Sequence, residues 1–136
     1  MSTLEISPEL LQSLPSSALV VFDVDNTLAN GTSPSEEIFE IRPGAIDLIT
    51  SLVQEGHRVY IWSAGGEKHA KEVSIAMDID RIVEGYFRKP SYPMQPDAVR
   101  DIFGQLPDLT IDDDYGEAIE GVPFSLTECW WGKLAD

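Results

Sequence analysis

Two aspartates and a threonine follow a short apolar run near the start of the chain. Residues 20–22 (VVF) lead directly into Asp23, and Asp25 and Thr27 follow at alternate positions. Burying one charge is costly, and two carboxylates side by side raise that cost further. The end of this run must therefore open to water or meet a positive group, and its carboxylates could bind a cation, act as a nucleophile or move protons.

Three further polar groups follow apolar runs in the same way. Ser63 follows the run RVYIW, Lys89 follows the run IVEGYF after one arginine, and Asp112 opens a triplet of aspartates after LTI. In a parallel sheet, the carboxyl ends of the strands share one edge, where ligands bind. If these runs are parallel strands, the polar groups surround one crevice.

The pattern of the whole chain predicts such a sheet. Short apolar runs alternate with segments whose apolar residues recur at helical spacing. We therefore expect a single α/β domain over residues 1–136, with a three-layer αβα, Rossmann-like parallel sheet. The expected strands are residues 18–22, 58–62, 82–87, 109–111 and 122–126. The expected helices start at Pro8 and Pro43 or cover residues 67–77 and 96–103, and residues 29–41 form a connector.

The residue types at this crevice suit phosphoryl transfer. Clustered carboxylates favour a hard cation with oxygen ligands, which points to Mg²⁺. Asp23 could attack phosphorus as a nucleophile, and Asp25 could protonate the leaving oxygen and later activate water. The Ser63 hydroxyl and the neighbouring backbone at Ala64 could hold phosphoryl oxygens. Lys89 offers a compact positive charge for the transferring group.

These residues resemble the motifs of the haloacid dehalogenase (HAD) superfamily. The run FDVDNT, which contains Asp23 and Asp25, looks like its first motif, IWS like its second, Lys89 like its third and IDD like its fourth. The resemblance covers about residues 18–126. It implies a HAD-like fold and Mg²⁺-dependent phosphoryl transfer through a phospho-aspartate. It also implies that the backbone carbonyl of Val24 joins Asp23 and a fourth-motif aspartate at the metal.

The fourth motif leaves a choice among four acids. One alignment makes Asp113 the first acid and Glu117 the second, and another makes Asp112 and Asp113 an adjacent pair. We expect Asp113 to be the main metal ligand with Asp112 in support, and Asp114 stays open as a third. At least one member of the triplet is expected to belong to an acidic surface turn.

Many HAD members carry a cap domain over the site, inserted at one of two positions. Here the segment after the first motif spans only residues 28–42, and a helix and a strand fill the segment between Ser63 and Lys89. The chain therefore resembles the capless members of the superfamily, whose open sites suit large substrates or a cover from another subunit. The expected partners are a small-molecule phosphoester or the phosphorylated end of a larger substrate, and a second copy of the chain as cover.

Composition limits the partners and the compartment. The 136 residues include 24 acidic and 9 basic side chains, for a formal charge of -15. This charge disfavours a broad nucleic-acid surface or a site for anionic membranes. The single cysteine, Cys129, excludes an intrachain disulfide, and we expect it to pack in the tail. With neither a signal pattern nor an apolar run near the ~20 residues of a spanning helix, we expect a cytoplasmic protein.

Two other functions stay open. A catalytically idle HAD-fold scaffold would use its acidic surface and a tail with Trp130 and Trp131 to bind a partner. Another phosphotransferase, such as a phosphomutase, fits less well, because an uncapped site would lose its intermediate. Of the two histidines, His57 precedes the second strand and is expected to pack at the far edge of the sheet. His69 could reach substrate from the helix after Ser63, but exposure to solvent is favoured.

Overall fold

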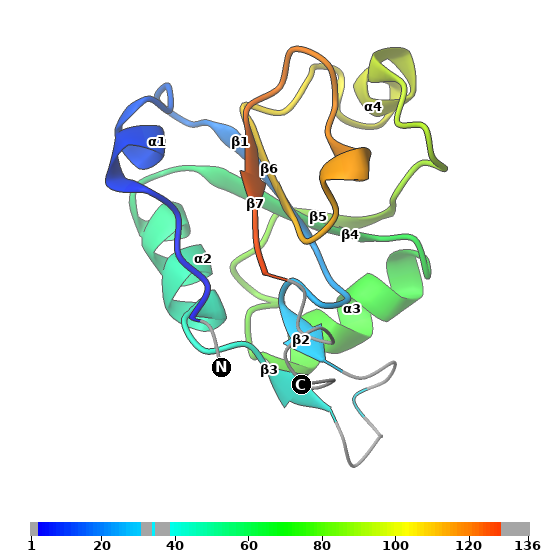
Figure 1. Ribbon diagram of the computed structural model, residues 1–136. Coiled ribbons are helices and arrows are strands. Elements are labelled where there is room, and N and C mark those ends of the chain that lie inside the picture. Colours follow the sequence, from blue (N-terminus) through cyan, green and yellow to red (C-terminus); the bar gives the residue numbers. More distant parts are fainter. Residues whose placement is uncertain (1–2, 31–33, 35–38, 129–136) are drawn as a thin grey trace.

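A parallel sheet of five strands forms the centre of the molecule (Figure 1). The computed structural model describes residues 3–30, 34 and 39–128. The strands lie in the order β5–β4–β1–β6–β7, and each adjacent pair is parallel. Their bounds are β1 Leu19–Asp23, β4 Arg58–Ser63, β5 Gly85–Arg88, β6 Leu109–Asp112 and β7 Phe124–Leu126. The central position of β1 gives the first motif a neighbour on each side.

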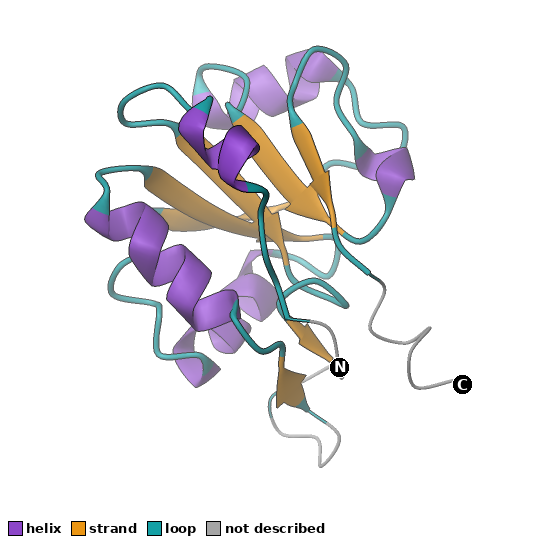
Figure 2. Cartoon of the chain, turned by 60° about the vertical axis from the view of Figure 1, so that its left-hand side comes forward, coloured by secondary structure: helices purple, strands orange, loops and turns teal. Residues whose placement is uncertain are grey.

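Helices cover both faces of this sheet, as Figure 2 shows. On one face, Phe22 of β1 packs in a core cluster with Ile49 and Val73, which belong to α2 and α3. On the other face, Val21 packs in a second cluster with Val99 of α4. Successive strand residues point to opposite faces, so both faces of β1 are apolar. The expected three-layer α/β fold is confirmed. The helices are α1 Pro8–Gln12, α2 Ala45–Gln54, α3 Glu67–Ala76, α4 Pro96–Phe103 and the 3-10 turn η1 Tyr115–Glu117.

Two glycines in the left-handed region mark helix boundaries. Gly104, with φ 76°, ends α4, whose bounds match the predicted residues 96–103. Gly44, with φ 85°, precedes α2, so this helix begins at Ala45 and the expected start at Pro43 is wrong. A Cβ at Gly44 would also lie 2.8 Å from the carbonyl oxygen of Leu4, so the N-terminal segment needs glycine there.

Most strand boundaries lie within one residue of the expectation, and larger differences occur at three places. β5 begins at Gly85, because the residues before it form turns. In these turns the N–H groups of Ile82 and Val83 donate to the carbonyl of Ile79. β7 begins at Phe124, two residues after the expected start. The connector after β1 contains two short antiparallel strands, β2 (Ala29–Asn30) and β3 (Glu40–Ile41). A strand of two residues is too short to show an alternation of apolar and polar residues in the sequence.

The chain leaves no space for an inserted domain between the second and third motifs. All residues from Ser63 to Lys89 are described, and they fold as α3 and β5 with short links. No helix in the described ranges has the length and apolar character needed to cross a membrane. The tail residues Cys129, Trp130 and Trp131 lie outside the described residues.

Candidate active site

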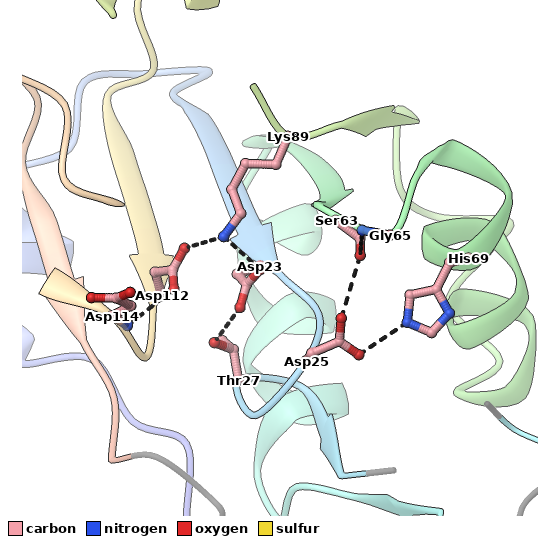
Figure 3. Close-up of polar contacts among 9 residues, drawn as sticks. All are labelled: Asp23, Asp25, Thr27, Ser63, Gly65, His69, Lys89, Asp112 and Asp114. Atoms are coloured by element: carbon pink, nitrogen blue, oxygen red, sulfur yellow. Dashed lines mark hydrogen bonds and ion pairs between the residues drawn. The ribbon is translucent and has the colours of Figure 1, made fainter. Parts of the chain in front are cut away.

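The strand ends bring most of the predicted site residues to one edge of the sheet. Asp23 is the last residue of β1, Ser63 of β4 and Asp112 of β6, and Lys89 directly follows β5. Figure 3 shows the side chains of Lys89, Asp23 and Asp112 pointing toward one another. This meeting of groups far apart in sequence follows from the parallel pairing of the four strands.

Lys89 bridges two buried carboxylates. Its Nζ lies 2.9 Å from Asp23 Oδ1 and 2.9 Å from Asp112 Oδ2. The three side chains are only 5–7% exposed. Water therefore screens these charges poorly, and each group depends on the others for its charged form.

The pKa values of Asp23 and Asp112 are raised even beside Lys89, so one lysine does not offset the cost of burying two carboxylates. Burial raises the pKa of Asp23 to about 8, and the Asp112 carboxylate raises it as well, while Lys89 lowers it. Burial also raises the pKa of Asp112 to about 6, against the lowering by Lys89. For Lys89, burial lowers the pKa, but the two aspartates outweigh burial and raise it above its ordinary value. The site carries excess negative charge, which a bound cation would neutralise.

Asp113 completes a cluster suited to a divalent cation. One oxygen from each of Asp23, Asp112 and Asp113 lies within 4.8 Å of the other two. An all-carboxylate donor set fits a hard ion such as Mg²⁺ and offers none of the nitrogen or sulfur ligands that softer metals prefer. The cluster thus fits the metal expected from the sequence, with Asp112 and Asp113 both near Asp23.

The two other candidate acids lie outside this cluster. Asp114 is exposed and caps η1, because its Oδ1 accepts a hydrogen bond of 2.9 Å from the N–H of Gly116. The N–H of Asp114 also donates to Asp112 Oδ1 at 3.1 Å, which helps to hold that carboxylate. Glu117 lies within η1 and is not part of the three-carboxylate group. Asp114 is therefore the surface-turn member expected from the triplet.

Thr27 orients the predicted nucleophile. Its Oγ1 donates to Asp23 Oδ2 at 3.0 Å, while the other oxygen of Asp23 faces Lys89. The Thr27 side chain is fully buried, so its hydroxyl has little freedom to turn away. Asp23 is thus held through both oxygens, which suits a group that must meet phosphorus in one direction.

The turn after β1 corrects one predicted metal ligand. The carbonyl oxygen of Val24 accepts hydrogen bonds from the N–H groups of Thr27, Leu28 and Ala29 at 3.2, 2.9 and 3.3 Å. A carbonyl oxygen has two lone pairs, so three donors leave it no capacity for a cation. Val24 is therefore removed from the ligand set that the resemblance implied.

Asp25 turns away from Asp23 and toward α3. Its Oδ2 lies 3.5 Å from Ser63 Oγ, and its Oδ1 lies 3.0 Å from His69 Nε2 (Figure 3). The Asp25 side chain is 47% exposed, in contrast to the buried Asp23. Asp25 thus follows the predicted nucleophile in the chain but lies in a wetter environment, and its role as acid and base stays a prediction.

Ser63 and its neighbours form the loop predicted to hold phosphate. The N–H of Gly65 donates to Ser63 Oγ at 3.0 Å, which fixes the hydroxyl near Asp25. The carbonyl of Ala64 accepts a hydrogen bond of 3.1 Å from Arg88, which borders this loop. Ala64 itself is exposed, whereas Ser63 is fully buried. Phosphate contact by Ser63 and Ala64 stays a prediction.

Of the two histidines, His57 lies as expected and His69 does not. His57 Nδ1 accepts a hydrogen bond of 3.0 Å from the N–H of Ala18, next to the start of β1, which confirms its packing role at the far edge. The expected exposure of His69 is wrong, because its side chain is 16% exposed and contacts Asp25. A signal was available, since the first turn of a helix after a strand end faces the crevice in such folds.

Arg42 is a second residue that sequence reasoning missed. Its side chain is buried, with 2% exposure. One guanidinium nitrogen donates to the carbonyl of Asn26 at 2.7 Å and also to the carbonyl of Glu128. Asn26 has φ 64° and follows Asp25, so Arg42 holds the turn that carries Asp25 against the distant end of the described chain.

Comparisons with known proteins support the fold. No family model matches the chain, and no curated protein matches it significantly. Among solved structures, the chain is similar to the haloacid dehalogenase-like family hydrolase SP0104 from Streptococcus pneumoniae, with a TM-score of 0.56 and 14% identity. That alignment covers 75% of this chain and 78% of the hydrolase. At such identity the likeness shows a HAD-like fold and does not show an activity.

Two other solved structures give similar values. An uncharacterized protein from Listeria monocytogenes serotype 4b has a TM-score of 0.55 and 15% identity, over 71% of this chain and 67% of that one. A chain of the Pnkp1/Rnl/Hen1 RNA repair complex has a TM-score of 0.56 and 14% identity. There the alignment covers 85% of this chain but only 44% of the other, so this chain corresponds to less than half of that protein.

Proposed function

We propose that this protein is a Mg²⁺-dependent phosphatase that hydrolyses a phosphomonoester through a phospho-aspartate on Asp23. One observation carries the proposal: Lys89 bridges Asp23 and Asp112 at 2.9 Å, with Asp113 within the same group of carboxylates. Such an excess of buried negative charge destabilises the folded chain unless a ligand offsets it, so it favours a functional role over a structural one.

Each protein group has a place in the reaction. An oxygen of Asp23 attacks phosphorus, and the bond between phosphorus and the ester oxygen breaks while Asp25 gives a proton to that oxygen. Water then attacks the phospho-aspartate, Asp25 takes a proton from the water, and inorganic phosphate leaves with Asp23 restored. Lys89 and Ser63, with the backbone at Ala64, hold the phosphoryl oxygens throughout.

The metal fits the carboxylate side of the site. Asp23, Asp112 and Asp113 are the residues that would hold Mg²⁺, with Asp113 as the predicted main ligand. When bound, Mg²⁺ would neutralise charge on the phosphoryl group and on the carboxylates. Mg²⁺ binding needs ionised Asp23 and Asp112. Because burial raises the pKa values of both carboxyls, the metal would compete with protons for them.

The substrate is proposed as a class. The uncapped edge of the sheet suits a small phosphoester or the phosphorylated end of a larger molecule, since no inserted domain lies between Ser63 and Lys89. The likeness to a chain of an RNA repair complex makes a phosphorylated nucleic-acid end one member of this class. The formal charge of -15 restricts contact with nucleic acid to such an end.

Replacing the nucleophile tests the proposal. We expect Asp23→Asn to lower hydrolysis of p-nitrophenyl phosphate at least ~1,000-fold, because no carboxylate remains to form the intermediate. Excess EDTA should stop the wild type, and added Mg²⁺ should restore it. The matched control is Asp101→Asn, which removes an exposed carboxylate on α4 and should leave the rate unchanged.

The outcomes separate the rival functions. Full activity of Asp23→Asn, or activity untouched by EDTA, would contradict the assignment. Failure of the wild type to turn over a broad panel of phosphoesters with Mg²⁺ would favour the catalytically idle scaffold. A phosphorylated product in place of free phosphate would indicate a phosphomutase.

A further inference from the structure

The contact between His69 and Asp25 has no part in the function proposed so far. His69 lies in the first turn of α3, and its Nε2 is 3.0 Å from Asp25 Oδ1 (Figure 3). This contact joins the helix that follows β4 to the turn that follows β1, two segments distant in sequence. It therefore arises from the fold and not from local chain geometry.

The two oxygens of Asp25 have different surroundings. Oδ1 faces His69, whereas Oδ2 faces Ser63 Oγ across a longer distance of 3.5 Å. The N–H of Gly65 holds Ser63 Oγ at 3.0 Å, so Oδ2 lies beside a fixed group of the predicted phosphate loop. His69 thus contacts one oxygen of Asp25 and leaves the other beside the predicted phosphate loop.

The His69 side chain is held by its surroundings, so it can restrict the orientation of Asp25 more than a water molecule would. Asp25 is 47% exposed on a turn, but the His69 side chain is only 16% exposed. Gly65 lies against the imidazole, because a Cβ at that position would come 3.3 Å from His69 Cδ2 and 3.3 Å from Ser63 Oγ. A small residue at position 65 therefore allows the ring and the hydroxyl to approach Asp25 together.

We propose that His69 is a positioning residue for the acid/base group of this site, which it orients by donating its Nε2–H to Asp25 Oδ1. The inference rests on the proposed phosphatase function, in which Asp25 moves the proton. His69 exchanges no proton with substrate. It keeps Oδ2 directed to the ester oxygen in the first step and to water in the second.

The chemistry gives this role a distinctive consequence. An alkoxide leaves poorly without a proton, whereas p-nitrophenolate is stable enough to leave without one. Loss of orientation at Asp25 should therefore lower kcat/KM for alkyl phosphates and spare kcat/KM for p-nitrophenyl phosphate, although the water step that both substrates share would lower kcat for both. Damage to the fold or to phosphate binding would slow both substrates equally.

Two substitutions at position 69 make the test. We expect His69→Phe, which keeps the ring and loses the donor, to lower kcat/KM for β-glycerophosphate by about 10–100-fold. For p-nitrophenyl phosphate the loss should stay below about 3-fold, and inhibition by inorganic phosphate should be unchanged. His69→Gln, which returns an N–H donor, should recover most of the alkyl phosphate rate. Lys68→Gln, which changes a side chain that is 92% exposed, is the control and should match the wild type.

A spectroscopic measurement adds a readout that does not depend on turnover. Long-range ¹H–¹⁵N spectra of the wild type should show a His69 imidazole with a proton on Nε2, and Asp25→Ala should alter that signal. Equal losses on both substrates in His69→Phe, or an imidazole signal unchanged by Asp25→Ala, would overturn the inference while the phosphatase stands. A wild type without any phosphatase activity would overturn the proposed function and this inference together.

Discussion

The candidate site has two halves that differ in burial and in what holds them. The buried half consists of Asp23, Lys89 and Asp112, and the open half is centred on the half-exposed Asp25, which contacts the buried Ser63 and the mostly buried His69. In the buried half the side chains are at most 7% exposed and interact as ions at 2.9 Å. In the open half, a half-exposed carboxylate meets a hydroxyl and an imidazole.

The difference teaches that the ion pairs that bear on stability and the proposed proton transfer are placed on separate residues. Removing the one cation from the buried ion cluster leaves its carboxylates uncompensated, so loss of Lys89 should lower the free energy of unfolding wherever they are ionised. A half-exposed group can be solvated when its partner is lost, so changes in the open half should affect rates alone. The following experiments test this difference between the two halves of the site.

Loss of Lys89 should have the largest effect. We expect Lys89→Met to abolish measurable turnover and to lower the free energy of unfolding at pH 9 by up to about 3–5 kcal/mol without metal, because the ionised Asp23 and Asp112 lose their cation. Protonation of Asp23, whose pKa is about 8, should relieve part of this loss at lower pH. Urea denaturation at pH 6 and pH 9 measures both effects.

Arg88→Met supplies the matched control for that experiment. Arg88 precedes Lys89 but is exposed, so its loss should change the free energy of unfolding by less than about 1 kcal/mol. Equal destabilisation by the two substitutions would show that the burial of Lys89 does not set its effect, and the contrast between the halves would fail.

The second effect is a dependence of stability on pH in the buried half. The folded-state pKa values of Asp23 and Asp112, about 8 and about 6, lie above their ordinary value of 3.8. Between the ordinary and raised values the folded state binds more protons than the unfolded state, so the free energy of unfolding falls as pH rises. In EDTA, Asp23→Asn should therefore melt higher than the wild type at pH 9 and close to it at pH 4.

Mg²⁺ should reverse this order. Because the metal needs ionised carboxylates, it should raise the melting temperature of the wild type more at pH 8 than at pH 5.5. The Asp23→Asn variant should gain less at both pH values. A wild type whose melting temperature responds to neither pH nor Mg²⁺ between pH 5 and 9 would rule out the charge excess in the buried half.

The smallest effect should separate two adjacent acids. Asp113 belongs to the three-carboxylate group, whereas Asp114 caps η1. We expect Asp113→Asn to weaken Mg²⁺ binding at least ~10-fold. Asp114→Ala should change the affinity less than about 2-fold and lower the free energy of unfolding by about 1 kcal/mol through the lost cap. Isothermal titration with Mg²⁺ and thermal melts measure these values, and reversed roles would place the metal further along the loop.

Much of the buried half could be predicted from the sequence. Asp23 and Asp112 were placed by short apolar runs, since the end of a buried parallel strand can lie only at the carboxyl edge of the sheet. Lys89 was placed by order in the chain even though its strand begins three residues later than expected. Burial of β1 on both faces could be inferred because the run before Asp23 is apolar throughout.

In the open half, Asp25 and Ser63 were predicted and His69 had a signal, but the contacts among them depend on features that no local pattern encodes. The contact of His69 depends on the rotation of α3 about its axis, which the packing of Val73 and Ala70 sets. The loss of Val24 as a ligand follows from how tightly the turn closes. The burial of Arg42 depends on the path of two segments that meet only after folding.

The double hydrogen bond from Arg42 has a mechanical consequence. A single guanidinium joins the carbonyl after Asp25 to the carbonyl of Glu128, more than a hundred positions later. Tension on the chain after β7 would therefore act on the turn that carries Asp25. The proposed phosphatase activity would in this way respond to events at a remote surface without any ligand entering the crevice.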